Sequence, residues 1–90
     1  MNKSEFVDAV AESADIPKST ASKAVDAMVD VISGSLKRGE QVSLVGFGTF
    51  LTRDREARQG RNPRTGETIQ IKASRVPSFK AGKGLKDAVN

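Results

Sequence analysis

Arginine dominates one segment of the chain, residues 53–75, and arginine is the side chain best suited to hold phosphate. The segment carries six arginines and Lys72 against three acids, whereas residues 1–52 contain a single arginine. A guanidinium group offers paired N–H donors that match two phosphate oxygens, and it also enters narrow minor grooves. Lysine and glutamate would serve equally well for solubility alone. The composition therefore favours contact with a nucleic acid.

The sequence around these arginines predicts a long β-hairpin. Residues 49–53 and 68–72 favour extended chain. Between them, Asn62-Pro63 opens a turn, and Gly66 closes it in a left-handed conformation. A two-stranded ribbon is marginally stable by itself. We therefore expect a flexible arm over residues 53–75 that depends on a partner for its order.

Pro63 at the predicted tip has two interpretations. It can simply preset the turn, because its ring restricts φ. It can also act as an apolar wedge, since minor-groove proteins insert proline or aliphatic side chains between base steps and kink the duplex. The residue chemistry alone favours neither interpretation.

The four aromatic residues, all phenylalanines, lie outside the arm. Proteins that bind single strands stack bases on aromatic side chains in the binding surface. A basic arm without such rings favours a duplex ligand. We expect the phenylalanines to belong to the core instead.

Helical and extended segments on either side must position the arm. Asn2 and Glu5 form a capping box for a first helix that ends at Asp15-Ile16-Pro17. Ser19, Thr20 or Pro17 could begin a second helix, which Lys37-Arg38-Gly39 ends. Strands follow around a reversal at residues 46–48, and residues 82–89 predict a short last helix. The expected class is α+β, with a two-helix hairpin, a three-stranded antiparallel sheet carrying the arm, and a C-terminal helix.

A chain of 90 residues makes one domain at most, and its core without the arm is small. The sequence has neither Cys nor His, so we expect no disulfide, no metal site of the usual kinds, no cofactor and no enzyme activity based on a Cys or His nucleophile pair. Oligomerisation remains as a means of stabilisation. The predicted dimer core contains three phenylalanines and apolar residues of the second helix and first strand: Phe47, Phe50, Phe79, Met28, Ile32, Leu36 and Leu44.

Charge is distributed unevenly between the two halves of the sequence. Residues 1–45 hold five basic and seven acidic side chains, whereas residues 46–90 hold ten basic and four acidic ones. This asymmetry predicts one part built for assembly and one for a polyanion. No run of residues reads as a signal peptide or a membrane span, so a cytoplasmic protein is expected.

These residues resemble the HU/IHF family of bacterial histone-like proteins over the whole chain. The resemblance rests on Gly46-Phe47-Gly48-Thr49-Phe50, on the arm segment from Gly60 to Gly66, and on the ending from Val76 to Lys86; the two termini look most like the β-type chain of HU. It implies an intertwined dimer, either a homodimer or a heterodimer with a paralogous chain, associated with the nucleoid. It also implies that two arms follow the minor groove of double-stranded DNA with Pro63 intercalating, and that Lys3, Lys83 and Lys86 hold flanking phosphates.

The resulting prediction is an architectural protein that binds duplex DNA with little sequence preference, favours bent, nicked or distorted sites, and bends and compacts the DNA. Residues 1–45 would form the helical dimerisation part and first strand, and residues 76–90 the return strand and last helix. The predicted DNA-binding residues are Lys3, Arg53, Arg55, Arg58, Arg61, Asn62, Pro63, Arg64, Arg75, Lys80, Lys83 and Lys86.

Three alternatives remain open: an IHF-like, site-selective DNA bender; an RNA-binding chaperone or ribosomal-type protein; and a protein–protein module. Three local features also depart from the expected pattern. Lys72 replaces a proline that often follows the returning strand, and Gly84 replaces an alanine, which predicts fraying of the last helix. Asp54 and Glu56 alternate with arginines and would lower the charge of the arm.

Overall fold

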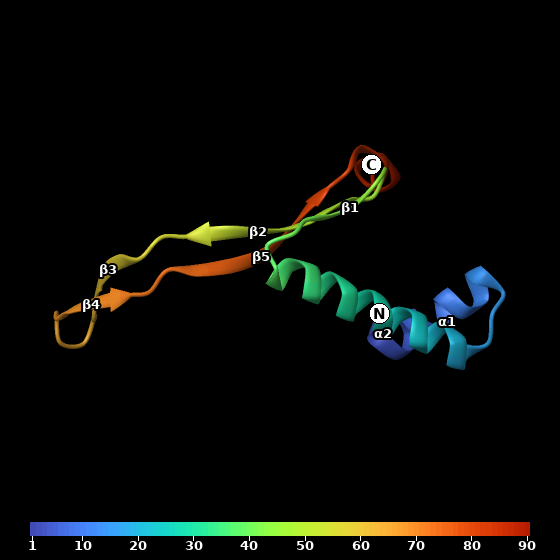
Figure 1. Ribbon diagram of the computed structural model, residues 1–90, viewed down its shortest axis with the longest axis horizontal. Helices are drawn as coiled ribbons and strands as arrows, with labels where there is room; N and C mark the ends of the chain where they lie inside the picture. The colour runs from blue at the N-terminus through green and yellow to red at the C-terminus, as the bar shows by residue number, and fades with distance from the viewer. The chain divides into compact units, whose positions relative to one another are not determined.

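The structure, a computed structural model, describes residues 1–90 with the exception of the Arg58 side chain. It confirms the α+β class and the predicted order of helices and strands (Figure 1). The chain divides into two compact units, Met1–Ser35 and Leu36–Asn90. The elements are α1 (Lys3–Ala14), α2 (Lys18–Lys37), β1 (Val42–Leu44), β2 (Gly48–Arg55), β3 (Arg58–Arg61), β4 (Thr68–Ile71), β5 (Ser74–Ala81) and α3 (Lys83–Ala88).

The first unit is a hairpin of α1 and most of α2. The Asn2 side chain accepts a hydrogen bond from the Glu5 amide at 2.9 Å, which confirms the predicted cap. Asp15 then ends α1 in a left-handed conformation with φ 56°. The second helix begins at Lys18, directly after Pro17, whose carbonyl accepts the Ala21 amide at 3.0 Å. Ser19 and Thr20 therefore lie within α2, and the prediction that either caps it was wrong.

The core of this unit is small. Val7 and Ala11 of α1 pack against Ala21 and Val25 of α2, with Val10 and Ile16 at the edge. Further along α2, the apolar residues lose this cover, because α1 spans only 12 residues and α2 spans 20. Met28, Val29 and Val31 are consequently exposed in the single chain, and Phe6 of α1 is exposed as well.

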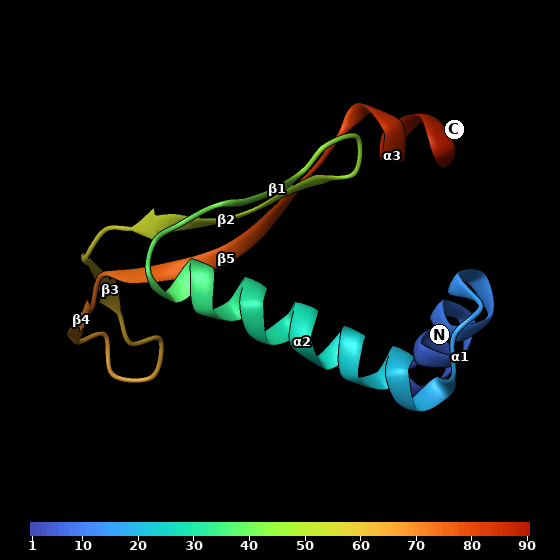
Figure 2. The same cartoon turned by 45° about the vertical axis from the view of Figure 1, so that its right-hand side comes forward.

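The second unit contains a three-stranded antiparallel sheet in the order β1-β2-β5. A tight turn joins β1 to β2: Gly46 has φ +82°, and the Phe47 amide donates to the Leu44 carbonyl at 2.9 Å. Helix α3 begins beside this turn (Figure 2), where the Leu85 amide donates to the Gly46 carbonyl at 3.1 Å. One hydrogen-bonded corner thus holds the first turn of α3 to the β1–β2 reversal.

Glycine at position 84 has a packing reason at this corner. A Cβ atom placed there would lie 2.5 Å from the Gly46 carbonyl oxygen, well inside contact distance. Without a Cβ atom, Gly84 lets the first turn of α3 approach the β1–β2 turn closely. The helix covers Lys83–Ala88, and Val89 is its C-cap, so it is slightly shorter than predicted.

The phenylalanines form a cluster but no closed core within one chain. The Phe79 ring lies between Phe47 and Phe50, with centroid distances of 5.4 and 4.8 Å. Phe47 and Phe79 nevertheless stay 45% and 41% exposed, and Leu44 is also exposed. One chain alone does not bury the predicted dimer core, of which only Phe50, Ile32 and Leu36 are half-buried, and its burial between two chains stays a prediction.

The arm continues outward from β2 and β5 at the end of the sheet away from α3 (Figures 1 and 2). The β2–β5 ladder ends at the pair Arg55–Ser74, and the β3–β4 ladder begins at Arg58–Ile71. Two residues on each strand separate the ladders, so the pairing register is the same on both sides. The hairpin is thus interrupted without a bulge, and Lys72, noted in the sequence, lies in the interruption.

Within the described residues, neither the long helix α2 nor any other helix has the length and hydrophobicity to cross a membrane.

Candidate nucleic-acid interface

The tip of the arm is a hydrogen-bonded turn built around Asn62. Its amide donates to the Glu67 carbonyl at 2.8 Å, its carbonyl accepts the Gly66 amide at 2.7 Å, and its side-chain oxygen accepts the Arg64 amide at 2.9 Å. Gly66 has φ +72°, as predicted. These bonds place Pro63 and Arg64 at the exposed end of the ribbon. Asn62 is therefore used by the turn itself, although we had predicted it as a DNA contact.

Strand pairing sorts the arm's charges onto two faces. In the base ladder, Arg53 lies opposite Val76 and Arg55 opposite Ser74, while in the tip ladder Arg61 lies opposite Thr68. Because successive side chains of a strand point to opposite faces and the register is continuous, these three arginines share a face. Lys80, paired with Thr49, belongs to the same set. We call Arg53, Arg55, Arg61 and Lys80 the cationic face.

Asp54 falls on the opposite face of the base ladder, where it pairs with Arg75. Glu67 lies opposite Asn62 across the tip turn, and Glu56 lies in the interruption between the two ladders. Among the ladder residues that the structure describes, the cationic face holds no carboxylate. The expectation that Asp54 simply lowers the arm's charge was therefore incomplete, since its place in the strand puts it on the face opposite Arg53 and Arg55.

Two predicted arginines need separate mention. The backbone of Arg58 opens β3 opposite Ile71, but its side chain lies outside the described residues. Arg75 lies on the acid-bearing face, and its Nη2 donates to the Lys37 carbonyl at 3.0 Å. This bond joins the base of the arm to the last turn of α2.

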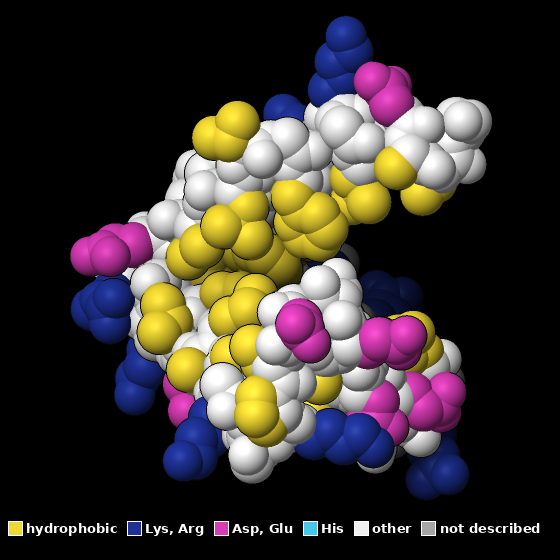
Figure 3. All heavy atoms as spheres, turned by 90° about the vertical axis from the view of Figure 1, so that its right-hand side faces the viewer, with side chains coloured by type: hydrophobic (Ala, Val, Ile, Leu, Met, Phe, Trp, Pro, Cys, Tyr) yellow, Lys and Arg dark blue, Asp and Glu magenta, His cyan; other side chains and the backbone are white. Residues whose placement is uncertain are grey.

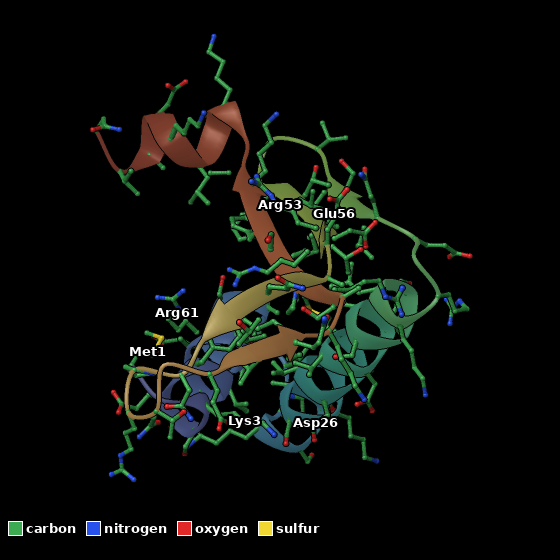
Figure 4. The ribbon with its side chains drawn as sticks, turned by 90° about the vertical axis from the view of Figure 1, so that its left-hand side faces the viewer. Met1, Lys3, Asp26, Arg53, Glu56 and Arg61 are labelled. Atoms are coloured by element: carbon green, nitrogen blue, oxygen red, sulfur yellow. The ribbon has the colours of Figure 1, made fainter. Side chains whose placement is uncertain are left out.

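Lys3 belongs to the first unit, apart from the arm. Its Nζ lies 2.6 Å from an Asp26 carboxylate oxygen, and Figure 4 shows the two side chains meeting between α1 and α2. The hydrogen bond and the charge of Asp26 raise the pKa of Lys3 above its usual value. An anion that approached Lys3 would therefore compete with Asp26 for the ammonium group.

Lys83 and Lys86 lie on α3 and are exposed. The amide of Leu85, in the first turn of this helix, is already used by the Gly46 carbonyl. This amide is therefore not available to an anion, and the junction between the helix and the β1–β2 turn explains the glycines. Any phosphate contact here would come from the lysine side chains.

Each unit also carries apolar surface, visible as yellow atoms in Figure 3. In the first unit it includes Met28, Val29 and Val31, which α1 does not reach. In the second unit it surrounds the Phe47–Phe79 pair and includes Leu44 and Val45. Large aromatic and aliphatic side chains that lie exposed next to one another are typical of an interface with another chain.

Three features had no clear signal in the sequence. The partner of Lys3 is 23 positions away along the chain, and the partner of Arg75 is a backbone carbonyl that has no residue signature. The third feature is an apolar strip on the arm, where Ile69 and Ile71 are exposed beside Gly60. Alternation of Thr68, Ile69, Gln70 and Ile71 was the only available indication of it.

Comparison with known proteins extends this description to the whole chain. The family described as "Bacterial DNA-binding protein" matches residues 1–90. The chain is 60% identical to DNA-binding protein HU-beta of Pseudomonas aeruginosa and 57% identical to HU-beta of Escherichia coli strain K12, in each case over all 90 residues and the full length of both chains.

Solved structures agree in fold. An Anabaena HU chain from an HU–DNA cocrystal structure superposes with a TM-score of 0.90 at 48% identity, covering 99% of this chain and 97% of that one. HU from Thermotoga maritima superposes with a TM-score of 0.70 at 31% identity, with both chains fully covered. The full-length family match, the identities and the shared fold together show that the chain belongs to the bacterial DNA-binding protein family that includes HU, as its sequence motifs indicated.

Proposed function

We propose that this protein is an HU-like architectural protein that binds double-stranded DNA with little sequence preference and bends and compacts it through the minor groove. The observation that carries the proposal is the cationic face of the arm, which ends in an exposed Pro63. A ribbon with arginines on one face can neutralise phosphates on both sides of a narrow groove. An apolar tip can then replace lost base stacking at a kink.

The binding unit is a dimer, and two observations support it. The closed core of the chain consists of four small side chains, Val7, Ala11, Ala21 and Val25. The larger apolar groups, among them Phe47, Phe79 and Met28, are left exposed. A second chain that covers these groups would supply the core that one chain lacks. The partner is either the same chain or a paralogue, and residues 1–90 then act as one DNA-binding domain.

Non-specific binding of this kind draws its affinity from counterion release and its site preference from DNA deformability. Less free energy is needed to unstack a base step in a duplex that is nicked, kinked or already bent, so the protein binds such duplexes more tightly. This role requires neither catalysis nor a cofactor, and it places the protein on the nucleoid in the bacterial cytoplasm.

The experiment compares Pro63→Ala with the parent protein on intact, nicked and four-way DNA, with bending followed by fluorescence transfer across a labelled duplex. Pro63→Ala should keep the dimer and most of the salt dependence but lose bending and the preference for the nick. That preference reflects a saved unstacking energy of a few kcal/mol.

Arg61→Ala is the control, because Arg61 lies two residues before Pro63 and its loss should weaken binding to all duplexes alike. Equal bending by Pro63→Ala and the parent would show that the proline only presets the turn. A single sequence that is preferred over random duplex by more than ~10³ would instead favour an IHF-like, site-selective protein. Preference for duplex RNA in the same salt series would favour the RNA-binding alternative.

A further inference from the structure

Arg75 differs from the other arm arginines in both its position and its partner. It pairs with Asp54 and therefore lies on the face opposite Arg53 and Arg55. Its guanidinium donates through Nη2 to the Lys37 carbonyl at 3.0 Å. A group that is already bonded on the far face of the ribbon is poorly placed to neutralise a phosphate held by the cationic face.

The acceptor of this hydrogen bond is a carbonyl at the carboxyl end of α2. Lys37 is the last residue of the helix, and the last carbonyls of a helix lack partners within it and carry partial negative charge. The chain then turns at Gly39, which has φ +80° and whose amide bonds back to the Leu36 carbonyl at 3.0 Å. Arg75 therefore supplies a positively charged donor where the helix end needs one.

The guanidinium also lies near Gly39. A Cβ atom at position 39 would lie 3.8 Å from Nη1 of Arg75, an ordinary van der Waals distance. The guanidinium is therefore next to the turn after α2, to which Nη2 is bonded through the Lys37 carbonyl. The base of the arm and the end of α2 form one local structure within the second unit.

This contact lies close to the point where the arm leaves the three-stranded sheet. Arg75 is next to Ser74, which forms the last pair of the β2–β5 ladder with Arg55. Beyond that pair the ladder is interrupted at residues 56–57 and 72–73 before β3 and β4 begin. The guanidinium is therefore bonded close to the last paired point of β5, at the end from which the arm departs.

We propose that Arg75 is a positioning residue that anchors the base of the arm to the carboxyl end of α2, and that it is not a phosphate ligand. The proposal rests on the proposed DNA-binding function, because the direction of the arm affects binding only if the arm contacts a duplex. It revises the sequence-based prediction that Arg75 contacts DNA. The anchor sets the direction in which the arm leaves the sheet and hence how well the cationic face follows the groove.

The test compares Arg75→Gln with Arg53→Gln, a matched control that removes the same charge from the neighbouring position on the cationic face. Affinity for one short duplex is measured across a salt series, and bending is measured by fluorescence transfer. Arg53→Gln should lower the slope of log affinity against log salt by about 0.9, the value of one phosphate contact. Arg75→Gln should keep the parental slope, lower bending, and weaken binding about three- to tenfold through the lost hydrogen bond.

A second measurement uses the free protein and needs no DNA. Amide exchange at Gly39, whose N–H closes the end of α2, should speed up in Arg75→Gln and stay at the parental rate in Arg53→Gln. Unchanged exchange in Arg75→Gln overturns the anchor, and so does a slope loss equal to that of Arg53→Gln. Failure of the parent to bind any duplex would instead reject the proposed function, while the exchange result would still decide whether the anchor exists.

Discussion

The base and the tip of the arm continue one antiparallel register yet use it for different purposes. In the base ladder, Phe50 lies opposite Phe79, and most β2 residues up to Thr52 are at least half-buried. In the tip ladder, all four residues of β4 are exposed. The same pairing rule thus supports packing at one end and a charged surface at the other.

The difference teaches that alternation along the strand, more than overall composition, determines what each part of the ribbon can do. In the base, one face presents aromatic rings and the other presents Lys80 and Arg53. In the tip, Ile69 and Ile71 lie on the face opposite Arg61. Because only the base carries large rings that approach each other, stability should depend on the base and nucleic-acid affinity on the face that runs through both.

Truncating the aromatic cluster should have the largest effect. Phe79→Ala removes the ring that contacts both Phe47 and Phe50, and we expect the free energy of unfolding to fall by ~3–5 kcal/mol, as for a covered core residue. Denaturation at several protein concentrations measures this loss and tests the dimer at once. Ile69→Ala at the exposed tip should change stability by no more than ~0.5 kcal/mol. A Phe79→Ala loss below ~1.5 kcal/mol would mean that the rings contact only each other and no second chain covers them.

A glycine pair compares the two ladders directly. A Cβ atom at Gly48 would lie 2.4 Å from the Phe79 ring and 2.7 Å from the Lys80 carbonyl, whereas one at Gly60 would meet only the side chains of Ile71, at 3.0 Å, and Ile69, at 3.5 Å. Gly48→Ala should therefore lower the free energy of unfolding by ~1–3 kcal/mol, the usual range for overpacking. Gly60→Ala should be much milder. Urea denaturation of both variants checks this, and equal losses would contradict the contrast between base and tip.

The segregation of charge predicts unequal effects for neighbouring residues of β2. Arg55→Gln removes a cation from the cationic face and should lower the salt slope of duplex binding by about 0.9. Asp54→Asn changes charge by the same amount on the opposite face and should leave that slope nearly unchanged. Salt titrations of both variants against one duplex provide the measurement. If Asp54→Asn raised the slope as much as Arg55→Gln lowered it, the two faces would not be functionally distinct.

We expect the smallest effect from a substitution in the helical unit, Met1–Ser35, which lies outside the ribbon. Asp26 raises the pKa of Lys3 above 10.5, so the ion pair contributes stability fully below that pH and loses it as pH rises through the raised pKa. The melting temperature of the parent should exceed that of Asp26→Asn slightly at pH 8–10, and the gap should close above that range. A gap that persisted to about pH 12 would point to a contribution other than the Lys3 charge.

Much of the fold could be predicted because its signals are local. The Asn2 cap, the stop at Asp15, the turn at Gly39 and the reversal at Gly46 each depend on residues within a few positions of one another. The same holds for the tip turn, where Asn62 and Gly66 were assigned their conformations from type and spacing alone. The family signature added the dimer and the duplex ligand, which no local pattern contains.

What the sequence alone determined was the order of elements, the arginine-rich arm and the turn at its tip, because backbone preference and turn chemistry act over short distances. The tertiary structure decided which side chains share a face and which are already engaged. It placed Asp54 opposite the cationic face, joined Lys3 to Asp26, and bonded Arg75 to a backbone carbonyl. Strand register and helix packing set these contacts, and both depend on residues that are far apart in the chain.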